Sequence, residues 1–372
     1  MNYRIAVPWL VRLSMALWLG VGWSAFAMPP ITKKPIIDSP PILAWPTDSG
    51  LVEPNLNDNA SDTMYDLHGQ IDSCELMLST EGNYHPALHD IWPVFLAKFK
   101  DRPLLNWMYS TSPPVMIPQL ANRQLQIGNI YSGCRPSVAV ASMRVIEKLV
   151  AAGLTDGQPL PLYTDRGSVI LVKHGNPKHI RTVWDLGRAD VHIVTPNPDR
   201  EKGAFSNYAE TIYNIARKDT HSPAGMTADS LFNNLFNSGN NGKWLAGERI
   251  HHRDLPWSIA YGRGDATVIF SHLARYTKAA FPNLFDIVPL GGTVEDPQPL
   301  PGSKIGTRYV VRIKGEWTPR QREAQEKLIE TLMSKEFSEV LTRRGLKRPD
   351  VNGGPGALTS VKNPSKEAKS LP

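Results

Sequence analysis

The chain has 372 residues, 41% of them hydrophobic, and a formal net charge of +6 at neutral pH. This length suits two lobes of ordinary size better than one single core. The basic residues form no Lys- or Arg-rich run or stripe, which excludes the nucleic-acid-binding class of proteins.

The first 27 residues have the pattern of a secretory signal peptide. Arg4 and Arg12 lie toward the start of an apolar stretch, and Ala25-Phe26-Ala27 is a small-x-small cleavage site. The apolar run is too short and broken to favour the alternative, an uncleaved membrane anchor. We therefore expect a periplasmic protein whose charge after cleavage is +4, because the leader holds these two arginines and no acidic residue.

Two further segments have no regular pattern. Residues 28–65 are proline-rich and polar without a period of 2 or 3.6, which predicts an extended arm or linker. Residues 350–372 are rich in Gly, Ser, Lys and Pro, and predict a disordered tail.

Cys74 and Cys134 are the two cysteines of the chain. Two cysteines in an exported protein favour one structural disulfide, and each of them comes just before a predicted strand. Two buried free thiols, or one exposed reactive thiol, remain as alternatives because spacing alone does not establish the geometry.

From Cys74 onward, strand and helix patterns alternate. Strands are expected over 74–78, 104–109 and 138–141, and helices over 86–100, 115–122 and 143–152. This order predicts an α/β fold with a parallel sheet between helices, and the ligands of such sheets gather at the carboxyl ends of the strands.

A crossing strand at 168–173 opens a second unit. We expect a short helix start at 182–186, a strand at 191–194, a helix at 204–217, a Gly/Asn-rich loop at 238–242, a strand at 266–270, a return crossing through 286–289, and helices at 319–333 and 335–344. The chain then divides into a signal peptide (1–27), an arm (28–65), the first part of lobe 1 (66–165), lobe 2 (166–283), the return segment and C-terminal helices of lobe 1 (284–349), and a tail (350–372).

Residues 191–213 are the most informative segment. A buried strand leads into a polar loop broken by Pro196, Pro198 and Gly203, and a helix follows. The first N–H groups of a helix have no internal partner, and the helix dipole adds about half a positive charge there. The segment therefore predicts the capture of a small anion.

Four phrases occur in an order that indicates a family. They are Ile170–Leu186 with its Asn-Pro turn, Thr195–Pro198 followed by Gly203-Ala204 and Asn207-Tyr208, Gly262–Phe270, and Leu341–Pro349. Over roughly 70–350 the chain resembles the type 2 periplasmic solute-binding proteins, especially the molybdate- and sulfate-type oxyanion binders of ATP-binding-cassette (ABC) importers. The resemblance implies two lobes, each a mostly parallel sheet flanked by helices, and a two-strand hinge that closes them over the ligand.

The chain departs from these family phrases at two places. Glu201-Lys202-Gly203-Ala204 replaces Ser-Gly-Gly-Ala, and Phe270-Ser271-His272 replaces Trp-Glu-Asn. A carboxylate at position 201 would repel a dianion, and Lys202 could compensate for it.

The resemblance and the helix starts together predict the ligand contacts. These are Thr80, Asn83, Tyr84, Ser142, Thr195, Gly203, Ala204, Ser206, Tyr208, Phe270 and Ser271. Helix capping is the alternative role for Asn83 and Ser142. Glu81 could orient a donor or bind a cationic group, Arg135 could pair with an oxyanion, and His272 could be a pH-sensitive donor.

No metal, cofactor or catalytic residue is expected. His251-His252 and the His85/His89 pair lack further ligands in a closed pattern, and the common enzyme motifs are missing from the sequence. We expect a monomeric carrier that delivers a small anion, such as molybdate, tungstate or sulfate, to an ABC permease in the inner membrane. The alternatives are a ligand-presenting sensor or accessory protein on the same fold, and an exported enzyme that uses Ser271 and His272.

Overall fold

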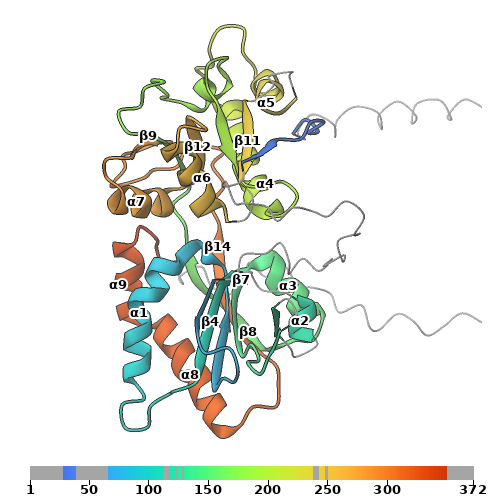
Figure 1. The fold of residues 1–372 in the computed structure, drawn as a ribbon, viewed down its shortest axis with the longest axis vertical. Coiled ribbons are helices and arrows are strands. Elements are labelled where there is room, and N and C mark those ends of the chain that lie inside the picture. Colours follow the sequence, from blue (N-terminus) through green and yellow to red (C-terminus); the bar gives the residue numbers. More distant parts are fainter. Residues whose placement is uncertain are drawn as a thin grey trace, which may run out of the picture.

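A computed structural model describes residues 28–38, 66–112, 117–121, 125–127, 130–237, 243–247 and 250–349. These residues form two lobes, each built on a six-stranded sheet with helices packed against it (Figure 1). The expected signal peptide, arm residues 39–65, the loop at 238–242 and the tail lie outside the described residues. No helix in the described ranges is long and apolar enough to cross a bilayer.

Lobe 1 contains the sheet with strand order β2-β4-β3-β7-β14-β8. Its strands are β2 (Asp66–Gly69), β3 (Leu76–Ser79), β4 (Trp107–Ser112), β7 (Val138–Ser142), β8 (Thr155–Thr164) and β14 (Thr307–Ile313), beside a two-stranded sheet of β5 (Leu125–Ile127) and β6 (Ile130–Ser132). Its helices are the 3₁₀ turn η1 (Gly82–Tyr84), α1 (His85–Ala97), α2 (Ile117–Ala121), α3 (Met143–Ala151), α8 (Pro319–Met333) and α9 (Lys335–Arg343). Only the centre, β4-β3-β7, is parallel.

Lobe 2 contains the sheet with strand order β1-β11-β10-β12-β9-β13. Its strands are β1 (Ile36–Asp38), β9 (Ser168–Lys173), β10 (Ile193–Thr195), β11 (Trp244–Gly247), β12 (Ala266–Phe270) and β13 (Phe285–Pro289). Its helices are the 3₁₀ helix η2 (Val183–Gly187), α4 (Lys202–Lys218), α5 (Ala228–Phe236), α6 (His251–Ala260) and α7 (Ser271–Ala280). β1, β11, β10 and β12 are parallel, while β9 pairs antiparallel with both of its neighbours, β12 and β13.

The strongly patterned elements lie where the sequence predicts them. β9, β12 and α8 have the expected ends, and α1, α3, β7 and α4 differ from expectation by a few residues at most. Among the elements that the sequence did not predict, β8, α6 and α7 each have a local reason. β8 contains Gly157, Pro159 and Pro161, α6 contains Pro256, and α7 follows β12 with no turn residue between them.

The segment 28–38 is part of lobe 2, whereas the sequence predicts an arm without regular structure. β1 adds a parallel edge strand to β11, and Met28 and Ile31 pack against the core of lobe 2. The Asn237 side chain accepts a hydrogen bond from the Thr32 N–H at 2.8 Å and donates one to the Pro30 carbonyl at 2.9 Å. Because these partners lie about 200 residues away in sequence, local composition could not reveal them.

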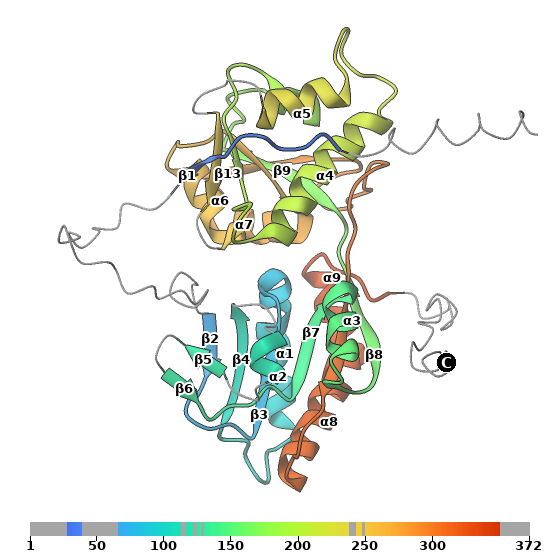
Figure 2. The same ribbon diagram turned by 90° about the vertical axis from the view of Figure 1, so that its right-hand side faces the viewer.

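Two connections on one side of the molecule join the lobes (Figure 2). One runs from β8 to β9 and the other from β13 to β14. The return crossing comes later than expected, because β13 pairs with β9 and stays in lobe 2. Asp165 links the two connections: its carboxylate accepts the N–H groups of Gly167 at 2.9 Å and Gly306 at 2.8 Å. Burial raises the pKa of Asp165 to about 6, although these hydrogen bonds oppose the shift.

The predicted disulfide between Cys74 and Cys134 is confirmed, with 4.8 Å between the two Cα atoms. The cysteines come shortly before β3 and β7, at the amino ends of the central strands of lobe 1. The disulfide therefore stabilises the end of lobe 1 that lies opposite the carboxyl ends of the same strands.

Candidate ligand cleft between the lobes

The carboxyl ends of the parallel strands in the two lobes face each other. In lobe 1, η1 and α1 follow β3, and α3 follows β7; in lobe 2, α4, α6 and α7 follow β10, β11 and β12. Figure 1 shows α4, α6 and α7 on the side of lobe 2 that faces lobe 1. The amino ends of these five α-helices therefore lie at the boundary between the lobes, called the candidate cleft below, and ligands of such sheets bind at this edge.

Direct contacts join the lobes across this cleft. The Nε2 atom of His272 on α7 lies 2.6 Å from the Asn83 carbonyl oxygen, and Arg253 on α6 pairs with Asp66 at 2.9 Å. The rings of His85 and His252 stack with their centroids 5.5 Å apart. Asn83, Asp66 and His85 belong to lobe 1, so the structure describes a conformation with the lobes in contact.

Helix capping differs between the helices of the cleft and the others. α5, α8 and α9 have side-chain caps, from Thr227, Thr318 and Ser334. In the described part of the chain, α1, α3, α4, α6 and α7 have no side-chain cap. An uncapped helix start retains N–H donors for a bound group. Ser142 is thus the N-cap residue of α3 but does not cap it with its hydroxyl.

On the lobe 1 side, an ion pair lies at the floor of the cleft. Glu81 Oε2 contacts Arg308 Nε at 2.5 Å, and the two side chains are 17% and 14% exposed. Glu81 Oε1 accepts the Ser142 N–H at 3.3 Å, and the Asn83 amide donates to Oε2 at 3.4 Å. Burial lowers the pKa of the Arg308 guanidinium, but the Glu81 carboxylate outweighs this and raises it.

On the lobe 2 side, a second acid–base pair lies at the start of α4. Glu201 Oε1 lies 2.8 Å from Nδ1 of His251, the first residue of α6. Burial opposes protonation, but the Glu201 carboxylate raises the pKa of His251. The loop before α4 is shaped by Asn197, whose side chain accepts the N–H groups of Asp199 and Arg200. A Cβ on Gly203 would lie 3.9 Å from the Arg144 guanidinium of lobe 1.

Five buried polar atoms around the cleft have no hydrogen-bond partner within the described ranges. They are Glu201 Oε2, His251 Nε2, His252 Nδ1, Ser271 Oγ and His272 Nδ1. Buried polar groups are normally paired, so unpaired ones mark a place where a ligand or water would bind. Burial lowers the pKa of His252 well below the usual value and that of His272 to about 4, which keeps both imidazoles neutral.

The structure separates the predicted contact residues into two groups. Asn83, Ser142, Gly203, Ala204 and Ser271 lie at helix starts that border the cleft. The other predicted contacts are engaged with neighbouring protein groups or with a core, and these are Thr80, Tyr84, Thr195, Ser206, Tyr208 and Phe270.

Each residue of the second group has a packing or hydrogen-bonding role. Thr80 donates to the buried Tyr84 hydroxyl at 3.0 Å, and Thr195 accepts from Trp244 Nε1 at 3.0 Å. Tyr208 packs in the core of lobe 2. Ser206 bonds to Glu210, and Phe270 joins a second core cluster of the same lobe.

Sequence reasoning missed Arg308 and the pairing of His251 with Glu201. Arg308 lies on β14, a strand that no hydrophobic pattern revealed. The adjacent histidines were noticed as a weak metal motif, but within the described ranges no group of three or more His, Cys, Asp or Glu could hold a metal ion.

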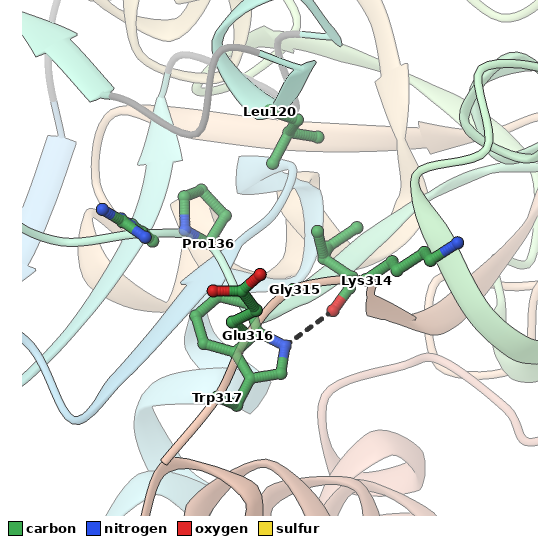
Figure 3. Close-up of a pocket in the computed structure, with 8 residues that line it drawn as sticks. Leu120, Pro136, Lys314, Gly315, Glu316 and Trp317 are labelled. Carbon is green, nitrogen blue, oxygen red and sulfur yellow. Dashed lines mark hydrogen bonds between the residues drawn. The ribbon is translucent and has the colours of Figure 1, made fainter.

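A small surface pocket lies elsewhere, at the opposite end of the lobe 1 sheet (Figure 3). It is lined by residues around Leu120, Pro136 and Trp317, and Trp317 Nε1 donates to the Ile313 carbonyl at 3.0 Å. Arg135 lines this pocket. Arg135 therefore lies near the amino end of β7, at the opposite end of this strand from Ser142.

Comparison with known proteins agrees with this architecture. Residues 132–347 match the sequence model described as bacterial extracellular solute-binding protein. Among solved structures, the sulfate-binding protein from Mycobacterium tuberculosis H37Rv is 17% identical with a TM-score of 0.52, covering 77% of this chain and 88% of its own. The Azotobacter vinelandii periplasmic molybdate-binding protein is 14% identical with a TM-score of 0.47, covering 74% and 100%.

No curated protein matches the chain by sequence. The identities to the solved structures are low, so those similarities concern the fold alone. The family match covers more than half of the chain and includes β7, the hinge, lobe 2 and the C-terminal helices. The chain therefore belongs to the family of bacterial extracellular solute-binding proteins.

Proposed function

We propose that this protein captures a small anion between its two lobes in the periplasm and delivers it to an ABC importer. The observation that carries the proposal is the contrast in capping: the five helices that start at the cleft have no side-chain cap, and α5, α8 and α9 do. Uncapped N–H groups and helix dipoles favour negative charge without a dedicated counter-ion.

Cations near the cleft also support an anionic ligand. Arg308 lies on the lobe 1 side, His251, whose pKa the Glu201 carboxylate raises, lies at the start of α6, and the Arg144 guanidinium lies close to Gly203. The two hinge connections allow the lobes to part for entry and to close again, as in other hinged binding proteins. A small oxyanion is the favoured ligand class, because the solved structure with TM-score 0.52 is titled as a sulfate-binding protein.

Binding without turnover is part of the proposal. The Ser271 hydroxyl has no hydrogen-bond partner within the described ranges, and His272 Nε2 is directed at the Asn83 carbonyl. A serine nucleophile needs a base within hydrogen-bond reach, and this pair does not form one. The arrangement therefore favours a carrier over an exported hydrolase.

Thermal unfolding of the ligand-free protein against a panel of anions tests the function. The panel contains molybdate, tungstate, sulfate, thiosulfate, phosphate, organic acids and, as controls, neutral amino acids. A ligand at about 1,000 times its Kd stabilises the folded state by about 4 kcal/mol, a shift on the order of ten degrees. A rise in the unfolding temperature with one anion supports the proposal, and an unchanged unfolding temperature with every anion would overturn it.

Delivery to an importer needs a separate test. The liganded protein would be titrated onto its transporter in proteoliposomes, with ATP hydrolysis as the readout. Stimulation that requires ligand supports delivery, while ligand capture with no effect on any ABC transporter would favour the accessory role instead.

A further inference from the structure

We propose that Glu81 determines which anions the cleft accepts: its carboxylate occupies the anion position of lobe 1, so fully deprotonated oxyanions are disfavoured and an anion that carries a hydrogen-bond donor is preferred. This inference rests on the proposed anion-binding function and deepens it. It assigns a specificity role to a residue of the chain's own cleft.

The contacts of Glu81 are those that a bound oxyanion would use. One carboxylate oxygen meets the Arg308 guanidinium at 2.5 Å and the Asn83 amide at 3.4 Å. The other accepts the Ser142 N–H at 3.3 Å, at the start of α3. A guanidinium, a helix start and an amide together are a typical environment for an anion.

In the described part of the chain, Glu81 is the acidic residue that pairs directly with Arg308. The nearby Asp165 carboxylate is committed to the N–H groups of Gly167 and Gly306. Within the described ranges, the salt bridge of Arg308 is with Glu81. Gly306 also leaves the room that the guanidinium fills, because a Cβ there would lie 2.5 Å from Arg308 Nη1. Removal of the Glu81 carboxylate would therefore leave a mostly buried cation that an external anion can neutralise.

Lobe 2 closes directly onto the loop that carries Glu81. A Cβ on Gly82 would lie 2.9 Å from His252 Cε1, and His272 Nε2 meets the Asn83 carbonyl. An anion held between the lobes would therefore lie next to Glu81 and could not avoid its carboxylate. Two negative groups in contact, with no proton between them, repel each other in a site that excludes water.

The unpaired atoms of lobe 2 favour the same kind of ligand. Glu201 Oε2 is an acceptor with no donor in the described part of the chain. His272 Nε2 faces a carbonyl and must carry the proton, so the unpaired and buried Nδ1 of the neutral ring is also an acceptor. Sulfate and molybdate are acceptors only, whereas hydrogen phosphate or the anion of a hydroxy or amino acid can donate to such atoms.

Sulfate binding to Glu81 variants tests the inference. Wild type, Glu81→Gly and Glu81→Gln would be titrated with sodium sulfate at constant ionic strength, by calorimetry and thermal unfolding. The matched control is Glu326→Gly, which removes the partner of Arg312 from a surface pair on the same strand. We expect Glu81→Gly to bind sulfate about tenfold or more tightly than wild type, and the control to behave as wild type.

Every outcome decides the question. Sulfate binding by wild type as tight as by Glu81→Gly would overturn the specificity role, while leaving the anion-carrier function intact. No gain of sulfate binding in either Glu81 variant would overturn the inference, because lobe 1 would then have no anion position. A gain in the variants while no anion of the panel binds wild type would overturn both the carrier function and the preference for a donor-carrying anion. If Glu81→Gly does not fold, the nearly isosteric Glu81→Gln carries the test.

Discussion

At the scale of single residues, Arg308 and Glu81 together make the most consequential contact of the cleft. Both side chains are largely excluded from water, and they lie on elements that are more than 200 residues apart in sequence. A pair of this kind can add little net stability while it is intact, but loss of one partner leaves a buried charge uncompensated.

Arg308→Ala should therefore lower the free energy of unfolding by about 3 kcal/mol. Arg312 lies on the same strand as Arg308 and forms an exposed pair with Glu326 of α8, and Arg312→Ala should cost at most about 1 kcal/mol. Urea denaturation measures both values. Equal decreases in the free energy of unfolding for the two variants would contradict this difference between the two pairs. The double variant Arg308→Ala with Glu81→Gln should recover part of the stability that Arg308→Ala loses.

His272 makes stability depend on pH. Its folded-state pKa of about 4 lies below the usual value because burial disfavours the charged ring, and Arg308, His85 and His251 add to the effect. The neutral ring therefore contributes stability above about pH 6.5, and this contribution is lost as pH falls toward 4. Asp165, whose pKa is raised to about 6, acts in the opposite direction, because its contribution is lost as pH rises.

His272→Gln should thus flatten the acid side of the stability profile. Denaturation midpoints between pH 4 and 7 would be compared for wild type and His272→Gln, with His221→Gln, an exposed histidine, as the control. A wild-type curve that falls no more steeply than that of His272→Gln would contradict the assignment.

At the scale of secondary-structure elements, capping separates structural helix starts from those that border the cleft. Thr227 accepts the Ser230 N–H at 3.1 Å and closes the first turn of α5. Ser142 occupies the corresponding position on α3 without such a bond. The first turn of α3 therefore depends less on its N-cap hydroxyl than the first turn of α5.

Thr227→Ala should cost about 1 kcal/mol of stability, whereas Ser142→Ala should cost less than about half of that in the ligand-free protein. Chemical denaturation gives the stabilities, and titration with the ligand found in the panel gives the affinities. We expect Ser142→Ala to lower the affinity for the ligand and Thr227→Ala to leave this affinity unchanged. A Ser142→Ala variant that is destabilised as much as Thr227→Ala would argue for a plain structural cap.

At the scale of the whole molecule, β1 shows that the lobes are built from interleaved parts of the chain. The described residues belong to lobe 2 at 28–38, to lobe 1 from β2 to β8, to lobe 2 from β9 to β13, and to lobe 1 again from β14 onward. Contacts at the mouth of the cleft, such as Arg253 with Asp66, hold the lobes together without belonging to the floor. These contacts should bias the equilibrium between open and closed forms.

Arg253→Ala should favour the open form and weaken ligand binding by about two- to fivefold, since exposed pairs contribute up to about 1 kcal/mol. Small-angle X-ray scattering would show a larger radius of gyration without ligand and a normal one at saturation. Arg188→Ala, which breaks a pair within lobe 2, is the matched control. An unchanged radius and affinity would mean that this pair does not influence closure.

The sequence by itself determined the class of fold, the order of most central elements and the region of the helix starts, and it favoured the disulfide that the structure then confirmed. These features depend on local patterns: β9 and β12 are continuous apolar runs, α8 is amphipathic, and both cysteines precede strands. The glycine and proline residues near helix starts can likewise be recognised from the local sequence around them.

Only the tertiary structure decided which side chains meet at the cleft. Glu81 pairs with Arg308, His251 contacts Glu201, and β1 in residues 28–38 pairs with β11. The partners in each case are 50 or more residues apart in sequence. It also placed Tyr208 in the core and Arg135 at the far end of lobe 1. Contacts between residues far apart in sequence produce no periodic pattern that could be recognised from the sequence. A charged residue at any position of a strand or loop can pair with a residue that folding brings close to it.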